Sequence, residues 1–367
     1  MKDTSPEAPF NRPLARRQFL GRGVKGVAAL GLSGGVGSVI AACGSSSSTS
    51  SAANATATSS LTPASLQLCY LENVQFAGSY FAQTKGYYKD AGLDVTLIPG
   101  GPSLAPEPVV VSGKALVGVS HTAEVIGAIL NGADLKIIGA TYQKNPTCIV
   151  SKASKPIKVP TDMYGKKVGI SDTNAPIWAS FVKANKLDLS KITVVTVGFD
   201  VTSLASGEID GLMAFAANEP TILKLQGVAP YVLLLSDFHY PLLEDLYIAT
   251  GANLADPSKA KTIAALMTGE SRGWTDVVAD PDEAATLAVN DFGKGIGLSL
   301  PQQKLEAQAQ NGFVVDADTK THGLFWMTPA KISGTIASLA LGGVKATPSM
   351  FTTQILSQVY KGGSVAA

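Results

Sequence analysis

The sequence predicts an α/β protein of two lobes, each built on its own parallel β-sheet. The chain has 367 residues, of which 46% are hydrophobic and 16% charged, a composition typical of a well-packed globular protein with about two domains. Strand-like runs alternate with amphipathic runs of helical length, which implies parallel β-α-β units. One internal repeat divides these units into two sets.

The repeat is recognised by the order of its elements. Residues 65–101 and 165–200 each contain a strand, a polar loop, a helix and a second strand. Each copy continues with a further helix and strand, from Ser112 in the first and from Ser206 in the second. With one inserted residue, Glu124 of the first copy aligns with Glu219 of the second. We therefore predict that each copy forms one lobe with its own sheet.

Ligand-binding loops are predicted where the parallel strands end. In open parallel sheets, ligands bind beyond the carboxyl ends of the strands, near helix N-termini. Two lobes that face each other would enclose one cleft between these loops. The helices from Ser258 onward are predicted to pack around the first lobe. The loops in question are residues 72–78, 99–103, 120–124, 171–176, 198–200 and 216–220.

The N-terminus predicts export. Arg16 and Arg17 precede Phe19 and Leu20 in a twin-arginine pattern, and the apolar run that follows is too short and glycine-rich for a membrane span. The sequence "IAAC" ends at Cys43 and matches a lipobox, in which the cysteine is acylated. Residues 45–60 form a Ser/Thr/Ala-rich tether. An ordinary cleaved signal with an incidental cysteine is the alternative.

Charge and cysteine content exclude several classes of function. The formal net charge is +1, and cleavage before Cys43 would leave a slightly acidic chain, which does not suit a nucleic-acid-binding protein. Cys69 and Cys148 lie in apolar, strand-like runs and are expected to behave as small hydrophobes, although export leaves a disulfide open. The three histidines have no metal-ligand spacing, so neither a metal site nor a cofactor is predicted.

Glu219 is the most informative single residue. It lies between an apolar run and Pro220, in a setting where an ionised carboxylate is costly unless it is paired. One interpretation places it at a helix start, with Asn218 as the cap and Pro220 at the first helical position. The other makes it an acceptor for a ligand. The two are compatible, because a helix N-terminus at a cleft is itself a ligand site.

Several segments resemble one known family. "KGYYKDAGLDV" (85–95), "QKNPTCIVSK" (143–152) and "NEPTIL" (218–223) are similar to NMT1/THI5-like solute-binding proteins of ABC importers, a group with binders of thiamine pyrimidine precursors and of riboflavin. The resemblance covers about residues 64–250. It implies a type II periplasmic-binding-protein fold with crossing strands at 147–152 and 246–252 and a helical C-terminal extension on lobe 1.

The resemblance also implies the organisation and partners of the chain. We expect a signal peptide at 1–42, a tether at 43–62, lobe 1 at 63–152 and 248–367, and lobe 2 at 153–247. The protein would be a monomer anchored by lipid to the outer face of the cytoplasmic membrane. It would bind a small molecule and deliver it to an ABC permease and ATPase. In pyrimidine-binding relatives the glutamate that matches Glu219 faces the ligand, as suits an exocyclic amine.

The candidate ligand-binding residues belong to the predicted loops and their neighbours. The aromatic members favour a flat heterocycle, and the absence of arginine between Arg22 and Arg272 argues against a small oxyanion. The candidates are Asn73, Gln75, Phe76, Tyr80, Gly100, Gly101, Ser103, His121, Thr122, Glu124, Tyr142, Asn145, Thr173, Asn174, Trp178, Phe199, Phe215, Asn218 and Glu219.

Three other functions stay open at this stage. The ligand could be riboflavin, or a sulfonate, taurine or nitrate, as in other members of the group. The chain could be an enzyme like the thiamine pyrimidine synthase of the superfamily, but it lacks that enzyme's cysteine-rich motif and no residue is predicted to be catalytic. An adhesion or signalling module could also use the same fold.

Overall fold

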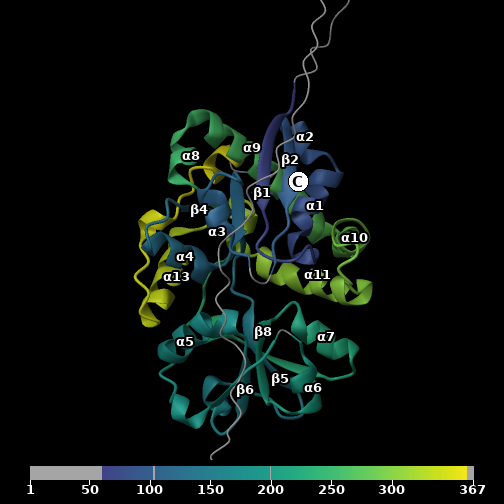
Figure 1. Cartoon of the computed structure of the whole chain (residues 1–367), viewed down its shortest axis with the longest axis vertical. Coiled ribbons are helices and arrows are strands. Elements are labelled where there is room, and N and C mark those ends of the chain that lie inside the picture. Colours follow the sequence, from purple (N-terminus) through teal and green to yellow (C-terminus); the bar gives the residue numbers. More distant parts are fainter. Residues whose placement is uncertain (1–59, 102–103, 199, 362–367) are drawn as a thin grey trace, which may run out of the picture. The chain divides into compact units, whose positions relative to one another are not determined.

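Two five-stranded sheets form the framework of the computed structural model, which describes residues 60–101, 104–198 and 200–361 (Figure 1). These residues belong to one compact unit. The first sheet has the order β2-β1-β3-β10-β4 and the second β7-β6-β8-β5-β9. The strands are β1 Thr62–Gln67, β2 Leu93–Ile98, β3 Val117–Ser120, β4 Lys136–Tyr142, β5 Thr147–Lys152, β6 Lys167–Ile170, β7 Thr193–Thr196, β8 Gly211–Phe215, β9 Pro230–Leu234 and β10 Glu244–Ala249.

The two sheets share one topology, which accounts for the sequence repeat. In the first sheet β1 pairs in parallel with β2 and β3, and in the second β6 pairs in parallel with β7 and β8. In both sheets the next strand is antiparallel and comes from elsewhere in the chain: β10 beside β3, and β5 beside β8. The predicted α/β fold of two lobes is therefore confirmed.

Helices cover the sheets and fill the connections between strands. They are α1 Ala77–Thr84, α2 Tyr87–Asp90, α3 Pro106–Val111, α4 Thr122–Leu130, α5 Ala175–Ala184, α6 Thr202–Ser206, α7 Glu219–Leu225, α8 Gly251–Ala255, α9 Pro257–Ala279, α10 Pro281–Leu287, α11 Leu300–Val314, α12 Ala317–His322, α13 Pro329–Leu341 and α14 Leu356–Val359. Short 3-10 turns lie in several connections, and η1 at Val74–Phe76 leads directly into α1.

The chain passes between the sheets twice. It leaves β4 and enters β5 through residues 143–146, and it leaves β9 and enters β10 through residues 235–243. Strand β5 pairs only within the second sheet and β10 only within the first, among the described residues. The lobe boundaries at residues 152 and 248 stay a prediction.

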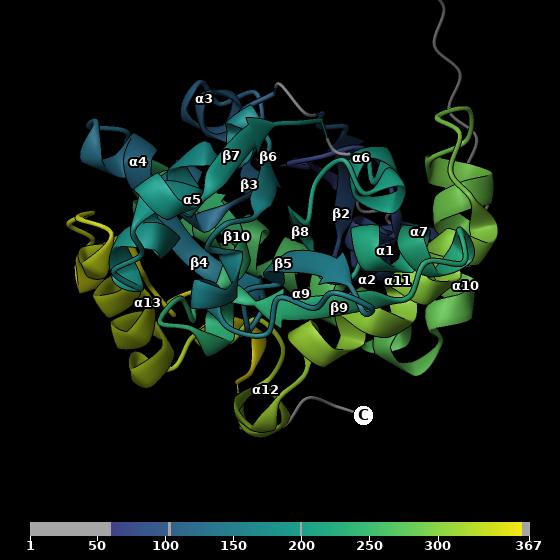
Figure 2. The ribbon, with the colours of Figure 1, turned by 90° about the horizontal axis from the view of Figure 1, so that it is seen from below.

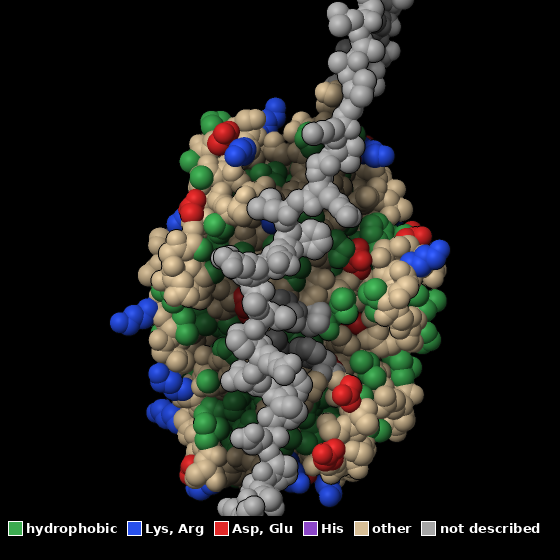
Figure 3. Space-filling model, in the orientation of Figure 1, with side chains coloured by type: hydrophobic (Ala, Val, Ile, Leu, Met, Phe, Trp, Pro, Cys, Tyr) green, Lys and Arg blue, Asp and Glu red, His purple; other side chains and the backbone are tan. Residues whose placement is uncertain are grey.

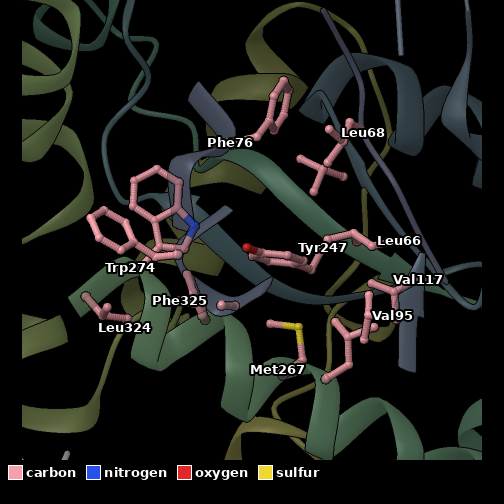
Figure 4. Packing of buried hydrophobic residues seen from close by; sticks show 14 of the residues in the cluster. Leu66, Leu68, Phe76, Val95, Val117, Tyr247, Met267, Trp274, Leu324 and Phe325 are labelled. Carbon is pink, nitrogen blue, oxygen red and sulfur yellow. The ribbon is translucent and has the colours of Figure 1, made fainter. Parts of the chain in front are cut away.

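The core of the first lobe lies between its sheet and α9. Figure 4 shows Trp274 and Met267 on this helix, together with Tyr247 of β10 and Leu66 of β1. Helices α1 and α9 meet at two glycines, because a Cβ added at Gly273 would lie 1.9 Å from the carbonyl oxygen of Gly78. This close backbone approach fixes α1, and with it the turn η1 that precedes α1.

The C-terminal helices reach further than predicted. They pack on the first lobe, as expected, but α11 also contacts α7 and α13 also contacts α5, both in the second lobe (Figure 2). A hydrophobic cluster runs across the α13 side and contains Ile137 of the first sheet, Ile149 of the second and Leu339 of α13. The extension therefore belongs to both lobes in its packing.

The surface carries no concentrated positive charge on the face that Figure 3 shows, where lysine and arginine side chains are scattered singly. Among the described residues, no helix combines the length and the apolar character needed to cross a membrane. The predicted signal peptide and most of the predicted tether, including Cys43, lie outside the described residues.

Candidate functional site

One cavity of about 300 Å³ lies where loops of both lobes meet. The loops after β1, β3, β6 and β8 contribute to it, and so do β4, β10 and α11. This is the position predicted from the carboxyl ends of the parallel strands. Its lining consists of Cys69, Tyr70, Gln75, Gly101, Leu104, Ala105, Pro106, Glu107, Ser120, His121, Glu124, Tyr142, Thr147, Asn174, Ile177, Ala214, Phe215, Ala217, Asn218, Glu219, Glu244 and Glu306.

Many of the residues singled out from the sequence come together here, although their contact with a ligand stays a prediction. Glu124 and Glu219, which the repeat aligns, both lie in the first turn of a helix and both line the cavity. The others in the lining are Gln75, Gly101, His121, Tyr142, Asn174, Phe215 and Asn218.

The remaining candidates lie outside the lining. Phe76 and Tyr80 are buried in the first core, where Tyr80 stacks on Phe292 at 4.1 Å. Trp178 is buried in the second hydrophobic cluster. Gly100 lies against the backbone of residues 68–70. Ser103 and Phe199 fall outside the described residues, as does the side chain of Thr173.

Three further candidates lie behind the cavity and hold its carboxylates. Asn73 donates to Glu306 Oε1 over 3.4 Å, and Asn145 donates to Glu244 Oε2 over 3.2 Å. The backbone N–H of Thr122 donates to Glu244 Oε1 over 3.1 Å. These residues position the lining and do not form it.

Glu219 begins α7 and is 8% exposed. Its Oε2 accepts the backbone N–H of Phe215 over 2.8 Å, so the side chain also fixes the turn between β8 and α7. Burial raises the pKa of Glu219 to about 7, although backbone hydrogen bonds from Phe215 and from Glu219 itself oppose the rise. Asn218 precedes the helix but makes no capping hydrogen bond with its side chain, contrary to the capping interpretation.

Glu306 on α11 is the second buried carboxylate of the cavity. Gln302 and Gln303 donate to its Oε2 over 2.7 and 2.8 Å. Burial raises the pKa of Glu306 to about 8, and the nearby charge of Glu219 adds to the rise. Gln302 also donates to Asn218 Oδ1 over 3.2 Å, which links α11 to the second lobe. Near neutral pH the two carboxyl groups are therefore partly protonated.

His121 is another lining residue and lies next to two acids of β10. Its Nδ1 is 3.2 Å from Glu244 Oε1 and 3.4 Å from Asp245 Oδ1. Burial opposes a charge on the ring, but Cys69, Asp245 and Glu244 outweigh it and raise the pKa of His121 well above its usual value. Cys69 and Cys148 are both free and buried, and burial raises the pKa of the Cys69 thiol to about 11.

The balance of charge in the lining limits what can bind. Five carboxyl groups line the cavity (Glu107, Glu124, Glu219, Glu244 and Glu306), and neither lysine nor arginine occurs among the described lining residues. Carboxylates accept hydrogen bonds and attract positive charge. Tyr70, Tyr142 and Phe215 add aromatic surface, with the Tyr142 and Phe215 rings 6.4 Å apart. The cavity therefore suits a flat molecule that carries hydrogen-bond donors.

Sequence reasoning missed Glu306, Glu244 and Asp245. Glu306 belongs to a helix whose polar residues Gln302, Gln303 and Gln310 are all buried. The polar face of this C-terminal helix could have indicated Glu306, because buried amide groups need hydrogen-bond partners. For β10, the signal was the pair of adjacent acids at the start of an apolar strand.

The chain is similar in sequence to two named binding proteins and similar in fold to a third. The chain is 24% identical over 313 residues to the riboflavin-binding protein RibY of Chloroflexus aurantiacus, which covers 83% of this chain and 88% of that protein. It is 25% identical over 238 residues to the formylaminopyrimidine-binding protein of Halalkalibacterium halodurans, over 63% and 71% of the two chains. The fold is that of the periplasmic aliphatic sulphonate-binding protein SsuA of Escherichia coli, with a TM-score of 0.54 and 16% identity over 68% and 79%. The relatives of similar sequence are thus named as binders of small molecules, and the fold is that of a periplasmic binding protein.

The family of this chain is established by a match to a sequence model of that family. Residues 73–284, more than half of the chain, match the model described as NMT1/THI5 like. The chain belongs to the NMT1/THI5-like family, as the resemblance in the sequence indicated.

Proposed function

We propose that this protein captures a small heteroaromatic ligand of the aminopyrimidine type in the cavity between its lobes and delivers it to an ABC permease and ATPase. The observation that supports this best is the lining with five carboxyl groups and no lysine or arginine among its described residues. An exocyclic amine donates hydrogen bonds, and Glu219 and Glu306 are acceptors for them. The aminopyrimidine relative supports the same ligand class.

Size supports a single-ring ligand. A cavity of about 300 Å³ lies at the lower end of the range of small-molecule sites. A pyrimidine ring with short substituents fits such a volume and leaves room for water, whereas a three-ring flavin with its sugar chain would fill it. Riboflavin remains the second candidate, because the RibY match covers 83% of this chain.

A sulfonate or nitrate is disfavoured on charge. The anion would meet several carboxylates and find a single basic side chain, His121, in the described lining. Unpaired like charges in a desolvated site are costly. We therefore propose that the protein recognises a neutral or cationic ligand. We also propose that it acts as a binder and not as an enzyme, and that it is a monomer.

The ligand assignment is tested by a panel of thermal melts and titration calorimetry. We expect 4-amino-5-hydroxymethyl-2-methylpyrimidine to raise the melting temperature, because a ligand at 100 times its Kd stabilises the folded state by about 2.7 kcal/mol. Taurine at the same concentration should leave the melt unchanged. Stabilisation by taurine alone would overturn the charge argument, and stabilisation by riboflavin alone would select the second candidate.

We also propose that the protein is exported and lipid-anchored through Cys43, on the basis of the lipobox and tether in the sequence. Replacing Cys43 by alanine should move the protein from the membrane fraction to the soluble fraction, since the acyl chains would supply the attachment. The measurement is immunoblotting of both fractions after a high-salt wash. Retention of the variant in the membrane fraction would contradict lipid anchoring.

A further inference from the structure

Three side chains that are distant in sequence converge beside the cavity. Cys69 follows β1, His121 precedes α4, and Asp245 is the second residue of β10. One ligand atom of each, the Cys69 sulfur, a His121 ring nitrogen and an Asp245 oxygen, lies within 4.8 Å of the other two. The organic-ligand proposal above does not use Cys69 or Asp245, so their convergence needs its own explanation.

The distances in this cluster are compatible with a coordination sphere as well as with an ion pair. His121 Nδ1 is 3.4 Å from Asp245 Oδ1 and 3.2 Å from Glu244 Oε1. Charge-assisted N–H···O⁻ bonds are shorter, at about 2.7–2.9 Å. Zinc binds imidazole nitrogen and carboxylate oxygen at about 2.0–2.1 Å with tetrahedral geometry, which separates neighbouring ligand atoms by about 3.3 Å. The 3.4 Å between His121 Nδ1 and Asp245 Oδ1 is close to this edge length.

Asp245 presents to the cluster one oxygen that accepts no hydrogen bond from the described residues. The residue is 1% exposed, and within the described chain its Oδ1 has no hydrogen-bond partner. Its Oδ2 accepts from Gln75 Nε2 over 2.7 Å, which orients the carboxylate. Such outer hydrogen bonds are what orients the ligands of metal sites.

We propose that Cys69, His121 and Asp245 bind one divalent cation of the zinc type. A thiolate with an imidazole selects a borderline-soft metal over calcium or magnesium, which prefer oxygen ligands. Binding exchanges protons for the metal: the Cys69 thiol and the His121 ring each release theirs to solvent as their ligand atoms coordinate. The cation would lie at the cavity wall and offset part of the charge of the five carboxyl groups.

Cobalt substitution tests this site without any organic ligand. The full chain is stripped with a chelator and titrated with Co²⁺, because ligation by a thiolate gives an intense sulfur-to-cobalt charge-transfer band. We expect the band in the wild type, saturating at one equivalent, and its loss in Cys69→Ser. Cys148→Ser is the matched control, since Cys148 is the other buried free cysteine of the described chain but lies in a separate cluster, and it should keep the band.

Zinc affinity gives the second readout. By competition with a chelating dye, His121→Gln and Asp245→Asn should each bind Zn²⁺ at least ten-fold more weakly than the wild type, about the effect of losing one part of a metal site. Thermal melts of the metal-free variants identify any that fail to fold. If only the near-isosteric Asp245→Asn folds, its zinc affinity is the test of the proposal. Three results would each overturn the proposal. They are absence of the cobalt band in the wild type, survival of the band in Cys69→Ser, and unchanged zinc affinity in folded Asp245→Asn.

Discussion

Gly273→Ala is expected to destabilise the first lobe by about 3 kcal/mol, at the upper end of what overpacking causes. The new Cβ would lie 1.9 Å from the carbonyl oxygen of Gly78 and 3.0 Å from the backbone nitrogen of Ala82. These are backbone atoms, so α1 and α9 would have to separate along their contact. The same movement would displace η1, which carries Gln75 of the cavity.

The measurement is the midpoint of urea unfolding, with Gly334→Ala as the matched control. Gly334 also lies within a helix, α13, but a Cβ there would meet no atom within 4 Å. Alanine at an open helical position is expected to stabilise by about 0.5–1 kcal/mol. The two identical substitutions should therefore shift the midpoint in opposite directions. A wild-type midpoint for Gly273→Ala would mean that the two helices are not in this close contact.

Glu219→Gln is expected to weaken aminopyrimidine binding about ten- to a hundred-fold, or about 1.5–3 kcal/mol. The amide keeps the shape of the side chain but turns part of the acceptor into a donor that faces the donor of the ligand. Glu219→Ala should cost at least as much. The amide oxygen of glutamine can still accept the Phe215 N–H, so the melting temperature without ligand should change little. Titration calorimetry beside a thermal melt measures both quantities.

The control for Glu219→Gln is Glu208→Gln, which removes an exposed carboxylate of the same lobe and should leave affinity unchanged. A purely structural role for Glu219 predicts the reverse pattern, with lower melting temperature and unchanged affinity. That result for Glu219→Gln would show that Glu219 does not contact the ligand.

The carboxyl groups of Glu219 and Glu306 are expected to make ligand binding depend on pH. An ionised carboxylate is a stronger hydrogen-bond acceptor than a neutral carboxyl group, and the pKa values of Glu219 and Glu306 in the free protein are raised to about 7 and about 8. Binding therefore releases protons, and affinity should rise as the pH rises through this window and level off above it. In Glu219→Gln the rise should be smaller, because one titrating group is gone and its charge no longer raises the pKa of Glu306.

The framework of this fold was predictable because it depends on local pattern. The repeat in the sequence reports two sets of β-α-β units, and the equal strand orders β2-β1-β3 and β7-β6-β8 follow from it. Glu124 and Glu219 were found for the same reason, since helix starts after parallel strands have a fixed place in such a sheet.

The rest of the site depends on contacts between distant residues. Glu306 meets Asn73 across 233 positions of sequence, and no local pattern shows which face of α11 lies over the cavity. Three aromatic candidates lie outside the lining for a different reason: Phe76, Tyr80 and Trp178 are close in sequence to cavity loops, but their side chains are buried in the hydrophobic clusters. Proximity in sequence to a binding loop does not fix the direction of a side chain.

The contacts of α11 and α13 with the second lobe differ in kind, which implies a hinge at α13 and a more easily broken contact at α11. At α13 the lobes share apolar surface, with Leu339 and Ile149 in one cluster, and exposing it to water would be costly. At α11 the contact includes hydrogen bonds from Gln302 to Asn218 and Thr221, which water can replace at a net cost of about 0.5–1.5 kcal/mol each. We therefore expect the lobes to swing apart about α13, with the α11 edge as the side that opens.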